Sequence, residues 1–208
     1  MSDLIIIGAG GFGLEVAAYA EDMTRAGKEN FVLKGFLDDT KTPSSRHAGY
    51  PVLGKIGPPF DPAISYVIAV GTPEWRKALA DKLHAGGARL ASIVHPQSYV
   101  AAGALIGPGS VIAPFAFVGP EARIGNHCVL NVHACAGHEC RIGDCCVLSP
   151  YASLQGSARL GEGVFLGSHA CITCVTIGDK ARIAAGAVVY NDVPSGALAL
   201  GNPAAFAA

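Results

Sequence analysis

The sequence predicts two folding units in one chain of 208 residues: a small α/β unit and, after it, a parallel β-helix. Strand-like and helix-like segments alternate over the first half, whereas a six-residue repeat begins at Val100. Charge also changes at this point, because residues 1–95 hold 10 Lys and Arg and 10 Asp and Glu, and residues 96–208 hold only 5 and 6. We therefore divide the chain into an α/β domain over 1–95, a β-helix over 96–192 and a C-terminal tail over 193–208.

Composition excludes several functional classes. Half of the residues are hydrophobic, yet the formal net charge is only −1, which gives no electrostatic reason to bind nucleic acid or an anionic membrane. No segment approaches the ~20 apolar residues of a membrane span. The first residues lack the basic flank and long apolar run of a signal peptide. We expect a cytoplasmic protein that binds neither nucleic acid nor membranes.

The first half reads as alternating strands and helices, which indicates a parallel sheet with helical crossovers. Apolar runs bounded by turn residues predict strands, and apolar residues at helical spacing predict helices. Residues 40–60, rich in Pro, Ser and Gly, are expected to form a loop. The expected strands are Leu4–Ile7, Phe31–Leu37, Ile64–Val70 and Leu90–Val94, and the expected helices are Leu14–Arg25 and Glu74–His84.

Residues 8–13 carry the glycine pattern G-x-G-x-x-G between the first strand and the first helix. Glycines at such a turn let the backbone approach a phosphate, and the helix N-terminus favours an anion. Asp38, at the end of the second strand, is placed to meet ribose hydroxyls. The pattern predicts a small Rossmann-like unit that binds a nucleotide-like ligand. It is also compatible with a tight turn that needs glycine for geometry alone.

The second half follows a hexad rule. Between Val100 and Ile172, twelve of the thirteen first positions are Val, Ile or Leu, and no fifth position is larger than Val. Because side chains alternate along a strand, a fifth position and the next first position share one face. A small residue followed by an aliphatic residue fills a narrow coil, which is typical of a parallel β-helix. The phase slips by one residue before Ile177.

The hexads, with the α/β head before them, Ile93-Val94-His95-Pro96 at the junction and Gly201-Asn202-Pro203 near the end, resemble a known family. This family is the hexapeptide-repeat sugar acyltransferases, in the branch of the bacillosamine and perosamine nucleotide-sugar N-acetyltransferases and sialic-acid O-acetyltransferase-like proteins. The resemblance implies a left-handed β-helix with three hexads per coil, a homotrimer, and acetyl-CoA as the acyl donor. It also implies a nucleotide-activated sugar as acceptor, in bacterial surface-glycan biosynthesis.

The segment from Asn131 to Asp144 is very similar to one that carries the catalytic base in that family. His138 matches the general base, and Glu139 matches the carboxylate that raises its basicity. A sugar amine or hydroxyl that attacks a thioester must lose a proton, and histidine titrates near neutral pH. A carboxylate beside the ring stabilises the imidazolium and fixes the tautomer. The alternative is that His138 is a polar corner residue on a binding scaffold.

The resemblance also assigns binding residues. Positions that hold the nucleotide sugar in the family match Gly10, Gly11, Phe12, Asp38, Asp39, Gly71 and Asn131. Gly156 matches a backbone amide facing the developing oxyanion, and Ser168 and Gly186 match acetyl-CoA contacts. Many relatives have His where Phe12 stands, and a coenzyme A contact that is His in relatives is Val147 here.

The cysteines and histidines are expected to hold no metal. Cys128, Cys140 and Cys146 fall on inward positions, and seven Cys suggest free thiols in a reducing compartment. Cys171-Ile-Thr-Cys174 has the form of a redox pair or half a zinc site, but it stands alone.

Two other functional classes remain open from the sequence. One is a zinc enzyme like the γ-class carbonic anhydrases, suggested by the His133-x4-His138 spacing, although a third His upstream is missing. The other is a non-catalytic trimer that binds a nucleotide sugar.

Overall fold

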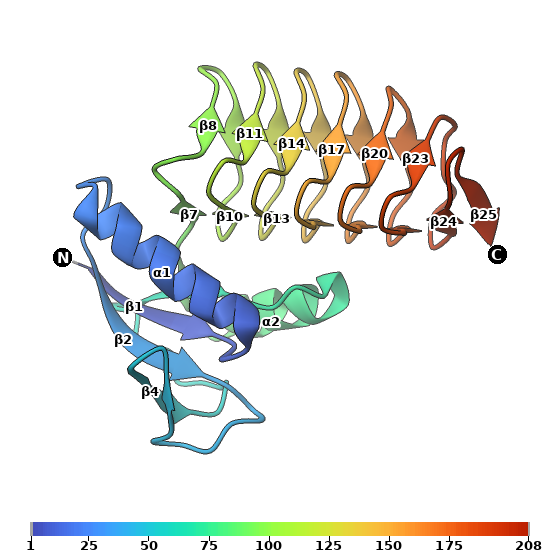
Figure 1. Ribbon diagram of the computed structural model, residues 1–208. Coiled ribbons are helices and arrows are strands. Elements are labelled where there is room, and N and C mark those ends of the chain that lie inside the picture. The colour runs from blue at the N-terminus through green and yellow to red at the C-terminus, as the bar shows by residue number, and fades with distance from the viewer. Residues whose placement is uncertain (1, 208) are drawn as a thin grey trace.

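The computed structural model describes residues 2–207. The first residue of the α/β domain, residue 1, and the last residue of the C-terminal tail, residue 208, lie outside the described residues. An α/β head is followed by a three-sided parallel β-helix (Figure 1). The six-stranded head sheet has the order β3-β4-β2-β1-β5-β6, and its pairings are parallel except that between β3 and β4. The head elements are β1 Ser2–Ile7, α1 Gly11–Arg25, β2 Phe31–Leu37, β3 Arg46–His47, β4 Tyr50–Gly54, β5 Ser65–Ile68, α2 Pro73–Ala85 and β6 Arg89–Leu90.

Two head elements differ from the sequence expectation. The expected loop over residues 40–60 contains β3 and β4, and β4 continues the sheet beside β2. The expected strand Leu90–Val94 is two strands, because β6 ends at Leu90 in the head sheet and β7 Ile93–Val94 pairs with β10 Val111–Ile112 in the β-helix. The chain therefore passes directly from the head sheet into the β-helix, with no long loop between them.

Three sheets form the sides of the β-helix, and most of their strands are two residues long. The first sheet contains β7, β10, β13 Val129–Leu130, β16 Val147–Leu148, β19 Phe165–Leu166, β22 Arg182–Ile183, β24 Leu198–Leu200 and β25 Ala205–Ala207. The second contains β8 Tyr99–Val100, β11 Phe117–Val118, β14 Cys135–Ala136, β17 Ser153–Leu154, β20 Cys171–Ile172 and β23 Val188–Val189. The third contains β9 Leu105–Ile106, β12 Arg123–Ile124, β15 Arg141–Ile142, β18 Arg159–Leu160 and β21 Thr176–Ile177.

The hexad rule is visible in the packing. The second residue of each strand is the first position of a hexad and points into the core, together with the fifth positions such as Cys128, Cys140 and Cys146, which are fully buried. The phase slip is also real, because Arg159 pairs with Thr176 rather than with residue 177. Three corners join the sheets: corner A from first to second, corner B from second to third, and corner C from third to first.

At the corners, glycine is required mainly where neighbouring coils touch, and less for the left-handed φ that usually explains glycine in tight turns. The fourth hexad position has a left-handed φ in coil after coil, yet it is often not glycine, as at His133 (φ +57°) and Glu139 (φ +60°). Glycine instead occupies the second position, where coils touch. A Cβ on Gly143 would lie 2.6 Å from the backbone of Gly161, so any side chain there would push two coils apart.

The head lies against the N-terminal part of the β-helix (Figure 1). Helix α1 packs on the outer side of the first sheet, and head residues share one buried cluster with Val111, Val129 and Val147. Helix α2 meets corner C. The fully buried Arg76 donates to the Ile68 and Val70 carbonyls of the head and to the His127 carbonyl of the β-helix, at 2.8–2.9 Å.

Candidate active site

His138 and Glu139 lie together on corner B, between β14 and β15. His138 Nδ1 lies 2.9 Å from Glu139 Oε2, and both side chains are more than half exposed. An ionised carboxylate only accepts hydrogen bonds, so Nδ1 carries the proton and donates it to Glu139. This tautomer leaves the lone pair on Nε2 free, which is the form that a general base requires.

Gly156 lies directly beneath the His138 ring, in the next coil of the same corner. A Cβ at residue 156 would overlap Cε1 and Nε2 of the imidazole. The two coils are joined here because Ser157 N donates to the His138 carbonyl at 2.8 Å. Only glycine at residue 156 lets the ring lie in this position, so the structure brings Gly156 and the dyad together.

The other predicted residues of the β-helix lie on corner A, across the second sheet from His138. Asn131 Oδ1 accepts a hydrogen bond from Val132 N at 2.7 Å, so its side chain fastens its own turn. Ser168 and Gly186 are in adjacent coils, and Gly186 N donates to the Ser168 carbonyl at 2.9 Å. The predicted acyl-donor residues are therefore divided between two corners, Gly156 on corner B and the other two on corner A.

In the head, the four glycines of residues 8–13 divide into two kinds. A Cβ on Gly8 would lie 2.9 Å from the Ala69 carbonyl oxygen, and one on Gly13 would overlap the Gly8 carbonyl. These two glycines serve close packing. Gly10 and Gly11 have no atom within 4 Å of a Cβ position, so packing within the chain does not require glycine there. Their exposed backbone is open to a ligand at the start of α1.

Asp38 holds the loop that follows β2. Its carboxylate accepts hydrogen bonds from Ala9 N (2.7 Å), from Thr40 N and Oγ1 (both 2.7 Å), and from Lys41 N (3.1 Å). Burial raises the pKa of Asp38, but these hydrogen bonds outweigh it and leave the pKa below its usual value. Asp39 accepts from Ile56 N at 2.8 Å. Both carboxylates thus accept hydrogen bonds from the backbone, and both also line a pocket beside this loop.

A pocket of about 410 Å³ opens between this loop and α2. Gly71 has open space around it, but it lies after β5 and does not line the pocket; Phe12 packs against the head core instead. The sequence reasoning missed Trp75, which is 67% exposed, although it is the one Trp of the chain. The pocket is lined by Gly8, Asp38, Asp39, Thr40, Ile56, Val70, Trp75, Ala78, Leu79 and Lys82.

The remaining histidines have structural partners. His95 is buried, accepts from Gln97 N on Nδ1 and lies 3.1 Å from Asp22 Oδ2 through Nε2. His84 and His127 meet through their Nε2 atoms at 3.0 Å, where α2 contacts corner C. Over residues 2–207, no group of three or more His, Cys, Asp or Glu is placed to hold a metal ion.

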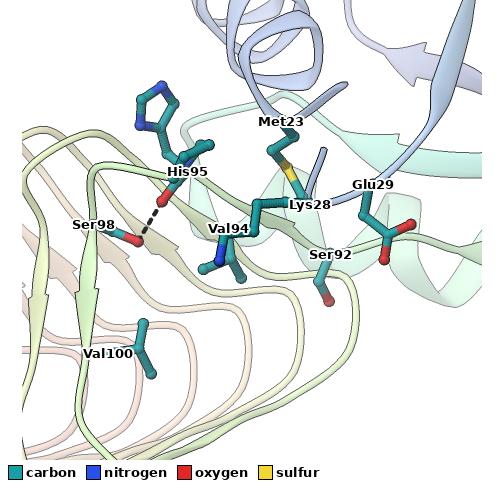
Figure 2. A pocket seen from close by; sticks show the side chains of 9 residues that line it. Met23, Lys28, Glu29, Ser92, Val94, His95, Ser98 and Val100 are labelled. Atoms are coloured by element: carbon teal, nitrogen blue, oxygen red, sulfur yellow. Dashed lines mark hydrogen bonds between the residues drawn. The ribbon is translucent and has the colours of Figure 1, made fainter. Parts of the chain in front are cut away.

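A cavity of about 450 Å³ lies where the head joins the first coil (Figure 2). Met23, Val94 and Val100 supply its apolar lining, and Ser98 Oγ donates to the His95 carbonyl at 2.7 Å. None of the predicted site residues lines it. Within residues 2–207, no helix is long and apolar enough to cross a membrane.

Comparisons with known proteins agree with this architecture. Residues 3–83 match the family described as the PglD N-terminal domain. The acetyltransferase domain of PglB from Neisseria gonorrhoeae FA1090 is 32% identical over 100% of both chains, with a TM-score of 0.90. The same domain in complex with acetyl coenzyme A is 33% identical over 99% of this chain and 98% of that chain (TM-score 0.89). PerB from Caulobacter crescentus, in complex with CoA and GDP-perosamine, is 29% identical over 100% and 98% (TM-score 0.87). A comparison with curated protein sequences found no match.

Proposed function

Because this chain belongs to the hexapeptide-repeat family of nucleotide-sugar acetyltransferases, we propose that it transfers the acetyl group of acetyl-CoA to an amino group of a nucleotide-activated sugar, with a sugar hydroxyl as the second candidate acceptor. The observation that carries the proposal is the His138–Glu139 pair, whose free Nε2 lies over a glycine in an exposed corner. No other pair among residues 2–207 combines a carboxylate-oriented imidazole with an exposed, unprotonated ring nitrogen.

In the proposed reaction His138 Nε2 takes the proton from the acceptor as its nitrogen or oxygen attacks the thioester carbonyl carbon. The new bond forms directly, without an acyl-enzyme, and Glu139 stabilises the imidazolium. The backbone N–H of Gly156 is the proposed donor to the developing oxyanion. When the carbon–sulfur bond breaks, the imidazolium of His138 donates its proton to the leaving thiolate, so coenzyme A departs as the thiol and His138 is neutral again.

The two units bind different substrates in this proposal, the head the nucleotide sugar and the β-helix the acyl donor. The pocket between Asp38 and Trp75, with the open backbone at Gly10 and Gly11, is the proposed site of the nucleotide. Gly71, Phe12 and Asn131 stay candidates for outer contacts. Within residues 2–207 no hydrogen bond joins the head to corner B, so we propose a homotrimer in which a head presents its sugar to His138 of a neighbouring subunit.

Open space at Gly186, next to Ser168, fits an extended acyl donor lying along the coils. No metal takes part in this scheme. The seven free thiols suit a cytoplasmic enzyme, and none serves as a nucleophile. Burial raises the pKa of Cys140 and Cys145 to about 11, which keeps both protonated and unreactive at neutral pH.

The test replaces the proposed base. His138→Ala removes proton transfer from the acceptor, so we expect kcat to fall by about 10²- to 10⁴-fold with the oligomer intact. Glu139→Gln keeps a hydrogen-bond acceptor but loses the charge, so its loss of kcat is smaller. Turnover is measured with acetyl-CoA and a panel of UDP-, GDP- and CMP-linked amino sugars. Near wild-type turnover in a folded His138→Ala enzyme would contradict the mechanism.

A further inference from the structure

Three arginines form a column on the outer face of the third sheet, beside corner B. Arg141 lies between Arg123 and Arg159 in the parallel ladder, and each is the first, outward-facing residue of its strand. Neighbouring strands are only about 4.8 Å apart, and like charges side by side destabilise a sheet. Within residues 2–207 no ion pair to any of the three relieves this repulsion. Packing of the fold therefore gives no reason for this column.

Two of the arginines begin the strands that leave the corner with the proposed base. Corner B runs from His138 into Arg141 and, in the next coil, from Gly156 into Arg159. Three residues of chain span at most about 11 Å, which limits the distance from each arginine Cα to the Cα of its corner residue. The two arginines therefore start at the same two levels as the imidazole ring and the glycine beneath it.

Hydrogen bonding keeps one of these cations at the corner. Arg141 Nη1 donates to the Glu121 carbonyl, which belongs to corner B in the preceding coil, at 2.9 Å. This bond uses one of the five N–H donors of the guanidinium. The Glu139 carboxylate accepts from His138 and forms an ion pair with neither arginine. Arg159, in the following coil, is exposed. Both cations can thus bind an anion that lies beside the corner.

The head pocket proposed for the nucleotide has the opposite charge. Asp38 and Asp39 line it, and both accept backbone hydrogen bonds as carboxylates. Of the described residues around it, Lys82 alone is basic, and its ammonium group donates to the Ile56 carbonyl. The N-terminus of α1 adds only about half an elementary charge. The diphosphate of a nucleotide sugar carries two negative charges, so it requires further cations outside this pocket.

We propose that Arg141 and Arg159 bind the diphosphate of the acceptor. This assignment rests on the proposed function, in which the head of a neighbouring subunit holds the nucleotide and presents the sugar to His138. One sugar ring separates the diphosphate of such an acceptor from its reacting group. The diphosphate therefore lies beside corner B when the reacting group meets the ring nitrogen. Guanidinium groups bind phosphate oxygens through paired N–H donors, and the two arginines match the two phosphates.

Removing one arginine at a time tests the proposal. Arg141→Gln and Arg159→Gln each lose a charged donor but no group that transfers a proton. We expect the KM for the nucleotide sugar to rise about 10-fold or more, with kcat within about threefold and the KM for acetyl-CoA within about twofold. Added NaCl should raise the KM for the nucleotide sugar more steeply in wild type than in either variant, because the lost contact is electrostatic. Arg159→Lys keeps the charge and should recover part of the loss.

The matched control is Arg123→Gln. It removes the same charge from the same column, one coil farther from Gly156, and should leave the KM for the nucleotide sugar within about twofold. The thermal midpoint of Arg159→Gln should not fall, because a contact between like charges disappears. Unchanged KM values in Arg141→Gln and Arg159→Gln, an equal rise in Arg123→Gln, or a rise in the KM for acetyl-CoA instead would each overturn the assignment.

If wild type acetylates none of the nucleotide sugars, the proposed function fails, and the arginines are tested by binding alone. Calorimetry with UDP and GDP compares wild type, Arg123→Gln and the variant that combines Arg141→Gln with Arg159→Gln. The combined variant should bind the preferred diphosphate at least about tenfold more weakly than the other two proteins. Equal affinity in all three proteins, or no binding of either diphosphate to wild type, would overturn the assignment regardless of the reaction.

Discussion

At the scale of single residues, the position of the His138 ring requires that residue 156 be glycine, which has no side chain. The carboxylate of Glu139 fixes the tautomer from one side, while the bare backbone of Gly156 supports the opposite edge of the ring. The sequence motif pointed to His138 and Glu139, because a histidine followed by an acid is readable in one dimension. The contact with Gly156 joins residues eighteen apart and becomes visible only when the coils stack.

Gly156→Ala should therefore impair the proposed base, although His138 itself is unchanged. The new methyl group would overlap Cε1 and Nε2, so the ring must rotate away from its present position. A displacement of about 1 Å at a catalytic group costs on the order of 10²-fold, and we expect a fall of that size in kcat. The thermal midpoint should change little, since the corner is exposed. Gly57→Ala, where a Cβ meets nothing within 4 Å, is the control; wild-type kcat in Gly156→Ala would refute the role of the bare backbone.

At the scale of elements, the contact between α2 and corner C is polar and buried. Arg76 binds three carbonyls, and His127 and His84 share one hydrogen bond. Arg76 Nη2 and His127 Nδ1 have no hydrogen-bond partner within residues 2–207. Such a contact holds the two units in one orientation, because any sliding would leave buried carbonyls without donors.

This contact predicts loss of stability in mild acid. Burial lowers the pKa of His127 to about 4, and the charges of His84 and Arg76 act in the same direction. Between about pH 6.5 and pH 4 the unfolded chain binds a proton at this position and the folded chain does not, so stability falls as pH falls. The loss of stability between neutral pH and pH 4 should be on the order of a few kcal/mol.

The measurement is the free energy of unfolding in urea at several pH values between 7 and 4. Asp144 and Asp81 oppose the shift, while Lys77 and Glu162 line the same small cavity, so all four are kept unchanged. His127→Gln should flatten the pH dependence. His133→Gln removes an exposed histidine and should not. An unchanged slope in His127→Gln would show that another group is responsible.

The elements also show why sequence reasoning succeeded in one unit and faltered in the other. In the β-helix each hexad buries its first and fifth residues in the same way. The repeat from Val100 to Ile172 therefore specifies the strands, the corners and the inward-facing residues together. In the head, β4 contains Pro51 and Gly54 and pairs with β2 only through tertiary contact, so residues 40–60 looked like a loop. The pocket proposed for the nucleotide is likewise lined by Trp75, which belongs to no local pattern.

At the scale of the whole molecule, the three faces of the β-helix differ in chemistry. The head covers much of the first sheet. The third sheet presents Arg123, Arg141 and Arg159 in register, with no ion pair to any of them among residues 2–207. The second sheet presents Tyr99 and Phe117, stacked at 5.1 Å, of which Tyr99 is 57% exposed. We therefore expect identical subunits to associate through the second sheet, which separates corner A from corner B.

Phe117→Glu should break this association. Burying a carboxylate in an apolar interface costs free energy, so we expect sedimentation to show monomers of 21.2 kDa where wild type gives trimers. Activity should fall in parallel, because His138 lies at the border of this face. Arg159→Glu makes a charge change of the same sign on the third sheet and should leave the trimer intact. A trimeric Phe117→Glu protein, or a monomeric wild type, would contradict the assignment.

The head also changes how the β-helix unfolds. A solenoid whose coils touch only their neighbours loses its end coils one by one, and its hydrogen exchange is graded from the ends inward. Here one buried cluster of the head spans Val111, Val129 and Val147, which belong to three successive coils. These coils open together or not at all, so their amide protons should exchange as one cooperative block. The coils beyond β19, which the buried residues of this cluster do not reach, keep the freedom to fray.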